Sequence, residues 1–135
     1  MKWRCVCVWD PKVTRPDWDM ARTWSQDMNP SAFDAIFSKQ VQALGSPGDV
    51  LLGFSTSGNS ANVIAAIEAA RAKDMTIIAL TGRKGGRIRE ILTETDVHIC
   101  VPHDRTARIQ EVHLLVLHCL CDAVDLQLLG EQENT

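Results

Sequence analysis

Three short apolar runs, separated by segments of helical character, constrain the fold of this chain more than any other feature. The runs are VLLGF, TIIAL and VHICV, at residues 50–54, 76–80 and 97–101. Apolar runs of about five residues without alternation are typical of strands buried on both faces of a sheet. Helical patterns surround them, at Phe33–Leu44, at Ala61–Lys73, in a short stretch ending near Leu92, and at Thr106–Leu129. This alternation predicts an α/β fold with a parallel sheet flanked by helices in three layers.

Length and composition limit the classes of protein to which the chain can belong. A chain of 135 residues fits one domain, and 45% apolar residues are enough for a core. The net charge is -3 with both signs interspersed, so we expect no direct contact with nucleic acid. The apolar runs fall short of a membrane span, and the N-terminus lacks the pattern of a signal peptide. We therefore expect a cytoplasmic protein that is not inserted in a membrane.

The character of the sequence changes near residue 32. All four tryptophans lie before that point, at Trp3, Trp9, Trp18 and Trp24, and no regular period is evident there. Residues 1–32 are interpreted either as an irregular arm that packs on a partner or as a non-native leader, and we favour the leader. A single domain is expected over residues 33–130, followed by a short tail at 131–135.

The loop between the first apolar run and the following helix carries the clearest chemistry. Residues 55–60 read STSGNS, with hydroxyls at Ser55, Thr56, Ser57 and Ser60. The first turn of a helix presents unpaired N–H groups and the positive end of the macrodipole, which together attract an anion. Gly58 allows close approach of the backbone. Because the loop contains no lysine, it suits a single phosphate monoester better than a nucleotide.

A plainer interpretation of the same loop is that Ser60 or Asn59 caps the helix. A cap requires one such residue, whereas this loop offers four hydroxyls, a glycine and an amide within six positions. Phosphate binding is therefore the preferred hypothesis. The following Gly-rich turn, residues 81–86, contains Arg83 and Lys84, which either attract an anion or belong to an ordinary surface turn.

Three segments in order carry a resemblance to a known family. GDVLLGFSTSGNSANVI, ALTGRKGG and RTARIQEVHLLVLH are similar to segments of SIS-domain proteins, most closely phosphoheptose isomerases, from about Phe33 to Leu129. The resemblance implies a flavodoxin-like, doubly wound SIS domain that is incomplete at its N-terminus. It also implies that Ser55, Thr56, Ser57 and Ser60 hold the phosphate of a phosphorylated sugar. The implied reaction converts sedoheptulose 7-phosphate to D-glycero-D-manno-heptose 7-phosphate for lipopolysaccharide.

The last helix is apolar nearly all round, so we expect it to be buried on every side. The family resemblance implies that this burial occurs in a homotetramer. It further implies that Gln110 and His118 are catalytic residues and ligands of a zinc ion. A histidine in an apolar helix is otherwise a hydrogen-bonded core residue, and positions eight residues apart are separated by about 12 Å along a helix. Zinc catalysis also requires about three protein ligands.

The sequence departs from the family pattern in one important respect. The family's remaining histidine and glutamate, and its GNGGS-type loop, have no counterpart here. We therefore expect this polypeptide alone to be inactive or nearly so. The alternative is a non-enzymatic SIS-domain scaffold that binds the replication initiator DnaA. That relative has Asn at the position of His118 and Arg at the position of Ser57, so these two residues favour the isomerase.

Overall fold

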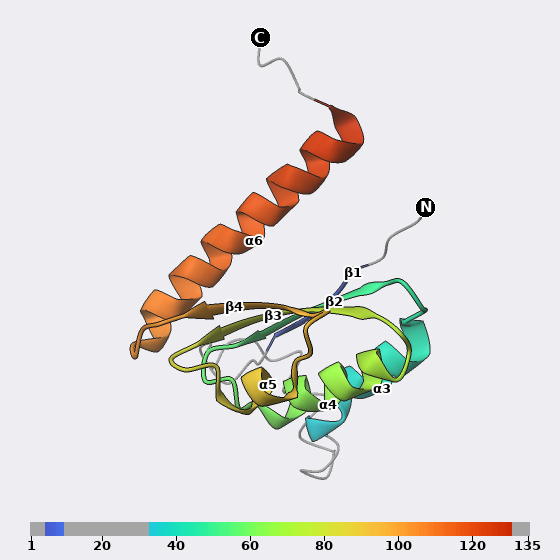
Figure 1. Cartoon of the computed structure of the whole chain (residues 1–135), viewed down its shortest axis with the longest axis horizontal. Coiled ribbons are helices and arrows are strands. Elements are labelled where there is room, and N and C mark those ends of the chain that lie inside the picture. The colour runs from blue at the N-terminus through green and yellow to red at the C-terminus, as the bar shows by residue number, and fades with distance from the viewer. Residues whose placement is uncertain (1–4, 10–32, 131–135) are drawn as a thin grey trace.

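The computed structural model describes residues 5–9 and 33–130. Its centre is a four-stranded parallel sheet in the order β1-β2-β3-β4. The strands are β1 (Cys5–Trp9), β2 (Val50–Ser55), β3 (Thr76–Gly82) and β4 (Val97–Val101). Helices α3 (Ile36–Leu44), α4 (Ala61–Arg71) and α5 (Gly86–Ile91) cover one face, while α6 (Thr106–Leu129) lies on the other (Figure 1). The expected three-layer α/β fold with a parallel sheet is confirmed.

The expected strands and helices agree closely with those observed. The strand at 97–101 and the helix Thr106–Leu129 have the expected bounds, and β2 extends one residue further than expected. Strand β3 continues to Gly82, two residues beyond the apolar run, because Thr81 and Gly82 pair with Cys100 and Val101 of β4. Hydrogen bonding to the neighbouring strand thus overrides the polar, Gly-containing sequence that suggested a turn.

Strand β1 corrects the expectation that residues 1–32 are irregular throughout. Residues Cys5–Trp9 pair in parallel with β2, from Cys5 opposite Val50 to Trp9 opposite Phe54. The run CVCVW has the length of a strand, but its partner lies more than 40 residues further along the sequence. Local periodicity gives no sign of such a pairing. The interpretation as a leader stays a prediction, and residues 1–4, 10–32 and 131–135 lie outside the described residues.

Two apolar clusters lie on opposite faces of the sheet. The larger one packs α3, α4 and α5 against the strands, and its fully buried members include Leu51, Ile67 and Ile77. The smaller one, around Phe54 and Leu80, lies beneath α6. Burying one such side chain contributes about 1.5–3 kcal/mol. The layer with three helices therefore supplies most of the core.

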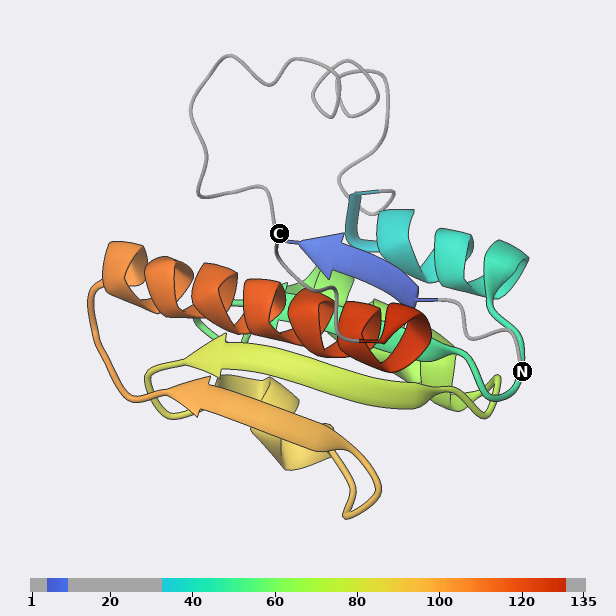
Figure 2. The ribbon, with the colours of Figure 1, turned by 90° about the horizontal axis from the view of Figure 1, so that it is seen from above.

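Helix α6 is largely exposed within the single chain. Only Ile109 and His113 are buried in it, and Leu128 near its end is 75% exposed. Figure 1 shows the helix rising away from the sheet towards its C-terminal end, and Figure 2 shows its course from above. Within this chain, β3 and β4 contact the helix, and its two buried residues lie in its first half. The expected burial of the remainder against other subunits stays a prediction.

The same helix also corrects the expectation that no apolar segment is long enough to span a membrane. Thr106–Leu129 is long and apolar enough to cross one, judged by length and composition only. One such helix is weak evidence, since core helices of soluble proteins meet the same criterion.

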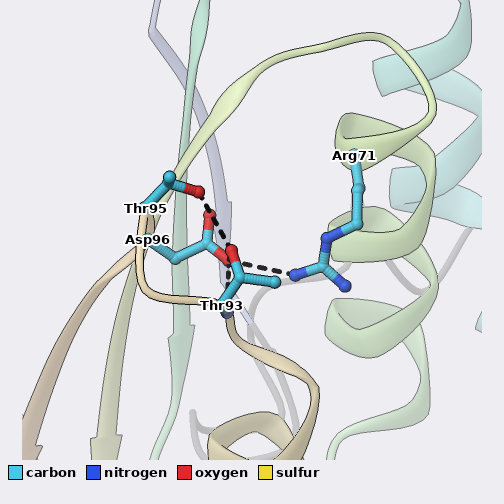
Figure 3. Close-up of polar contacts among 4 residues, drawn as sticks. All are labelled: Arg71, Thr93, Thr95 and Asp96. Carbon is cyan, nitrogen blue, oxygen red and sulfur yellow. Dashed lines mark hydrogen bonds and ion pairs between the residues drawn. The ribbon is translucent and has the colours of Figure 1, made fainter.

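A polar cluster fixes the edge of the sheet that lies opposite the loop at residues 55–60. The Asp96 carboxylate accepts hydrogen bonds from the Thr93 N–H (2.8 Å), the Thr93 hydroxyl (2.9 Å) and Arg71 Nη2 (3.0 Å), as Figure 3 shows. Burial alone raises the pKa of Asp96, but the hydrogen bonds from Thr93 and the Arg71 charge outweigh it and lower this pKa below 3.8. The cluster thus ties the end of α4 to the start of β4.

We predict that Asp96→Asn lowers the free energy of unfolding at pH 7 by about 1–3 kcal/mol, the usual range for hydrogen bonds to a charged group. A lowered pKa gives stability that is present above the unfolded value and is lost as pH falls through the folded value. The difference between the wild type and the variant should therefore shrink in acid, as measured by urea unfolding between pH 7 and about pH 2. Glu94→Gln, at an exposed carboxylate of the same turn, is the control. A difference that is independent of pH would contradict the prediction.

Candidate anion-binding site

The loop STSGNS joins the carboxyl end of β2 to the first residue of α4. Its two terminal serines are buried, with Ser55 2% and Ser60 8% exposed, and their Oγ atoms lie 2.7 Å apart. The Gly58 N–H donates to both the carbonyl oxygen and the Oγ of Ser55, at 3.1 Å each. Thr56 and Ser57 are half-buried. The terminal serines therefore brace the loop, while Thr56 and Ser57 form its more accessible rim.

The plainer interpretation of a helix cap does not describe this loop. Ser60 is the N-cap residue of α4, but its side chain makes no capping hydrogen bond and contacts Ser55 instead. The side chain of Asn59 also binds elsewhere, since its Oδ1 accepts from the Arg87 N–H of α5 at 2.9 Å. The assignment of Ser55, Thr56, Ser57 and Ser60 as phosphate ligands stays a prediction.

A second loop, between β3 and α5, packs directly on the first. Gly58 has a φ of +69°, and a Cβ built on it would overlap the carbonyl oxygen of Gly85. The Gly58 carbonyl oxygen accepts a hydrogen bond from the Ile88 N–H at 2.9 Å. The backbone of the second loop therefore leaves no room for a side chain at Gly58, which requires glycine. Gly85 favours glycine for a different reason, because its φ is +90°.

The start of α6 also packs beside the loop at residues 55–60. A Cβ on Gly82 would lie 2.6 Å from the carbonyl oxygen of Thr56 and would overlap the side chain of Ile109. Ile109 is fully buried in the first turn of α6, and the candidate residue Gln110 follows it in the chain. The first turn of α6 thus packs on Gly82 beside the loop, and Gln110 is the next residue of that helix.

Thr81, at the end of β3, lies between two histidines. His113 is 5% exposed, and its Nε2 donates to the carbonyl oxygen of Thr81 at 2.8 Å. The Thr81 hydroxyl lies 2.7 Å from Nε2 of His98. Burial lowers the pKa of both histidines, and the Arg89 charge lowers that of His98 further, whereas the bond to Thr81 partly opposes the shift at His113. Both shifts favour the neutral form of the imidazole. The sequence alone singled out neither Thr81 nor His98, because each becomes notable only through contacts across strands.

The two residues expected to bind a metal lie in different environments. Gln110 is half-buried, and its Nε2 is buried with no hydrogen-bond partner within residues 5–9 and 33–130. His118 is exposed, about 12 Å further along the helix axis. Among the described residues, no group of three or more His, Cys, Asp or Glu side chains is placed to hold a metal. Gln110 and His118 by themselves therefore do not fit a zinc site.

Basic side chains lie at the carboxyl edge of the sheet, where the candidate loop also lies. Arg83 and Lys84 are exposed directly after β3, and Arg83 adopts a positive φ of 58°. Their charge favours an anion at this edge over the opposite one, although no bond between them and the loop at residues 55–60 is evident.

Comparison with known proteins places these features in a family context. Residues 19–82 match the SIS domain family. The chain is 75% identical over 103 residues to a phosphoheptose isomerase of Methylibium petroleiphilum, covering 76% of this chain and 52% of the relative. It is 68% identical over 101 residues to that of Azoarcus sp. strain BH72, covering 75% and 51% respectively. The chain thus spans about half the length of these relatives.

Solved structures give the same result. The phosphoheptose isomerase from Neisseria gonorrhoeae superposes with a TM-score of 0.70 at 62% identity, over 72% of this chain and 54% of that one. The enzyme from Francisella tularensis gives a TM-score of 0.69 at 46% identity, over 72% and 53%. The predicted resemblance to SIS-domain phosphoheptose isomerases is confirmed. The family match begins at residue 19, earlier than the Phe33 at which we placed the start of the resemblance.

We predict that Gly58→Ala is much more damaging than Gly48→Ala. Both residues have a positive φ, which costs a residue with a Cβ about 1–2 kcal/mol. At Gly48 nothing lies within 4 Å of the added atom, whereas at Gly58 it meets the Gly85 carbonyl. Unfolding in urea should give about 1 kcal/mol of destabilisation for Gly48→Ala and at least twice that for Gly58→Ala. Equal losses would show that the two loops are not in tight contact.

We predict that stability falls as pH drops below about 6.5, and that His113 contributes to the fall. A lowered folded-state pKa means that the unfolded chain takes up a proton which the folded chain resists. The contribution of His113 to the free energy of unfolding is therefore complete above pH 6.5 and is lost progressively below it. His113→Gln keeps an N–H donor but does not titrate, so its pH profile of unfolding should be flatter. His98→Gln, measured in the same way, gives the contribution of His98 to the pH dependence of the free energy of unfolding. Identical slopes in the wild type and His113→Gln would refute the assignment.

Proposed function

We propose that this chain acts as part of an isomerase of phosphorylated sugars, with the loop at residues 55–60 holding the substrate phosphate. The observation that carries the proposal is the position of this loop. It joins the carboxyl end of a buried parallel strand to the first turn of α4, and its rim consists of Thr56 and Ser57. The dipole of the first helical turn favours an anion there. The names of the similar proteins support the same proposal.

The substrate that we propose is sedoheptulose 7-phosphate, which the isomerase converts to D-glycero-D-manno-heptose 7-phosphate for lipopolysaccharide. Such a reaction moves a proton between neighbouring carbons through an enediol and requires an acid or base near the operating pH. Gln110 is the best placed of the candidate residues, because Ile109 beside it packs on Gly82, which in turn contacts Thr56. Its amide nitrogen is buried and has no hydrogen-bond partner among the described residues, which supports a polar partner from outside them.

Zinc, the oligomeric state and the location belong to the same proposal. We propose that His118 and Gln110 contribute to zinc binding together with ligands from outside the described residues. Zinc would polarise the substrate oxygens. We also propose a homotetramer, because the apolar side chains along α6 require a covering surface. A cytoplasmic location without insertion into a membrane, and no direct binding of nucleic acid, complete the proposal.

The alternative of a scaffold for the initiator DnaA gains no support from the comparisons. The relatives and structures described above carry the name of the isomerase. Ser57 and His118, at which the scaffold differs, have the residues expected of the isomerase.

We predict that the chain binds sedoheptulose 7-phosphate and does not bind sedoheptulose at the same concentrations. Ser57→Ala should weaken binding by about fivefold to tenfold, since one hydrogen bond contributes about 1 kcal/mol. Titration calorimetry measures both effects. Thr95→Ala removes an exposed hydroxyl at the opposite edge of the sheet and should bind like the wild type. Equal binding of the two sugars, or of neither, would refute a phosphate site.

A further inference from the structure

Asn59 is an exposed residue that nevertheless uses both ends of its side chain. Its Nδ2 donates to the carbonyl oxygen of Ser57 at 3.1 Å, and its Oδ1 accepts from the N–H of Arg87 at 2.9 Å. Its own backbone N–H donates to the Oγ of Ser57 at 3.2 Å. One residue thus contacts Ser57 twice and also links the loop at residues 55–60 to the start of α5.

The space around this link is closed. A Cβ on Gly86 would lie 2.6 Å from the carbonyl oxygen of Ser57 and 2.8 Å from Oδ1 of Asn59. Asn59 is therefore held against the second loop by backbone atoms, and its amide has a fixed orientation. A side chain that merely pointed into solvent would not be confined in this way.

The hydrogen bonds leave Ser57 ready to donate. Its Oγ accepts from the Asn59 N–H, and its carbonyl oxygen accepts from Nδ2. Neither bond uses the hydroxyl hydrogen, since a hydroxyl can accept and donate at the same time. Asn59 thus fixes the position of the Ser57 oxygen while keeping its O–H available for an anion at the rim of the loop.

We propose that Asn59 is a positioning residue for phosphate binding, which acts by holding Ser57 and by fastening the loop to α5. This inference rests on the proposed function, because it requires that the loop binds phosphate. Asn59 itself does not contact the phosphate. The sequence suggests only a helix cap for this residue, whereas its bond to Arg87 joins positions 28 residues apart.

The test compares affinity with stability in two variants. Asn59→Ala removes both side-chain bonds and should weaken binding of sedoheptulose 7-phosphate and of inorganic phosphate about tenfold. Asn59→Asp keeps an acceptor for the Arg87 N–H but loses the donor to Ser57 and places a negative charge beside the loop. It should unfold closer to the wild type than Asn59→Ala does, yet bind phosphate no better. If Asn59→Ala does not fold, Asn59→Ser replaces it in the same comparison, because serine is uncharged and too short to make both side-chain bonds.

Thr93→Ala is the matched control, since it removes the hydrogen bond from the Thr93 hydroxyl to Asp96 at the opposite edge of the sheet. It should lower the midpoint of unfolding and leave phosphate affinity unchanged. If Asn59 has only a structural role, Asn59→Ala should likewise lower the midpoint of unfolding and leave phosphate affinity unchanged. That result would overturn the inference about Asn59 but not the phosphate site. If the wild type binds no phosphate, the proposed function and this inference fail together.

A double-mutant cycle tests the route through Ser57. If Asn59 acts by holding Ser57, then Asn59→Ala combined with Ser57→Ala should bind phosphate only slightly more weakly than the weaker single variant. If the loss of affinity in the double variant equals the product of the two single losses, Asn59 acts independently of Ser57. That result would overturn the proposed route.

Discussion

Direct contact between two backbones is the constraint on which the candidate site depends. Gly58 lies so close to the backbone of Gly85 that its position tolerates no side chain, and the Ile88 N–H donates to the Gly58 carbonyl oxygen across the same gap. This contact fixes a polar loop that apolar packing alone would leave free. Because the loop follows a buried strand, the core of the sheet fixes the position of the loop.

The end of β3 connects this loop to the opposite face of the sheet. Gly82 contacts the loop through Thr56, and Thr81 accepts a hydrogen bond from His113 of α6. A polar group in such an apolar place is costly unless it is paired, so the bond also fixes the position of the helix. The first half of α6 is consequently part of the site, whereas its second half has no partner among the described residues and remains exposed.

Much of the fold was predictable because its signals are local. The apolar runs at 50–54 and 97–101 and the long pattern at 106–129 gave strands and a helix with nearly the observed bounds. The errors arose where contacts are not local. Strand β1 is stabilised by pairing with a distant segment, and β3 is lengthened by its neighbour β4. The exposure of α6 depends on which surfaces the rest of the chain offers, which periodicity does not reveal.

The sequence by itself determined the class of fold, the place of the candidate loop and its hydroxyl chemistry, because each follows from the identity and spacing of neighbouring residues. Only the tertiary structure decided which of these hydroxyls are buried. It turned Ser55 and Ser60 inward onto each other, left Thr56 and Ser57 at the rim, and gave Asn59 a partner in α5. The physical reason is that hydrogen bonds and close packing join groups far apart in the chain.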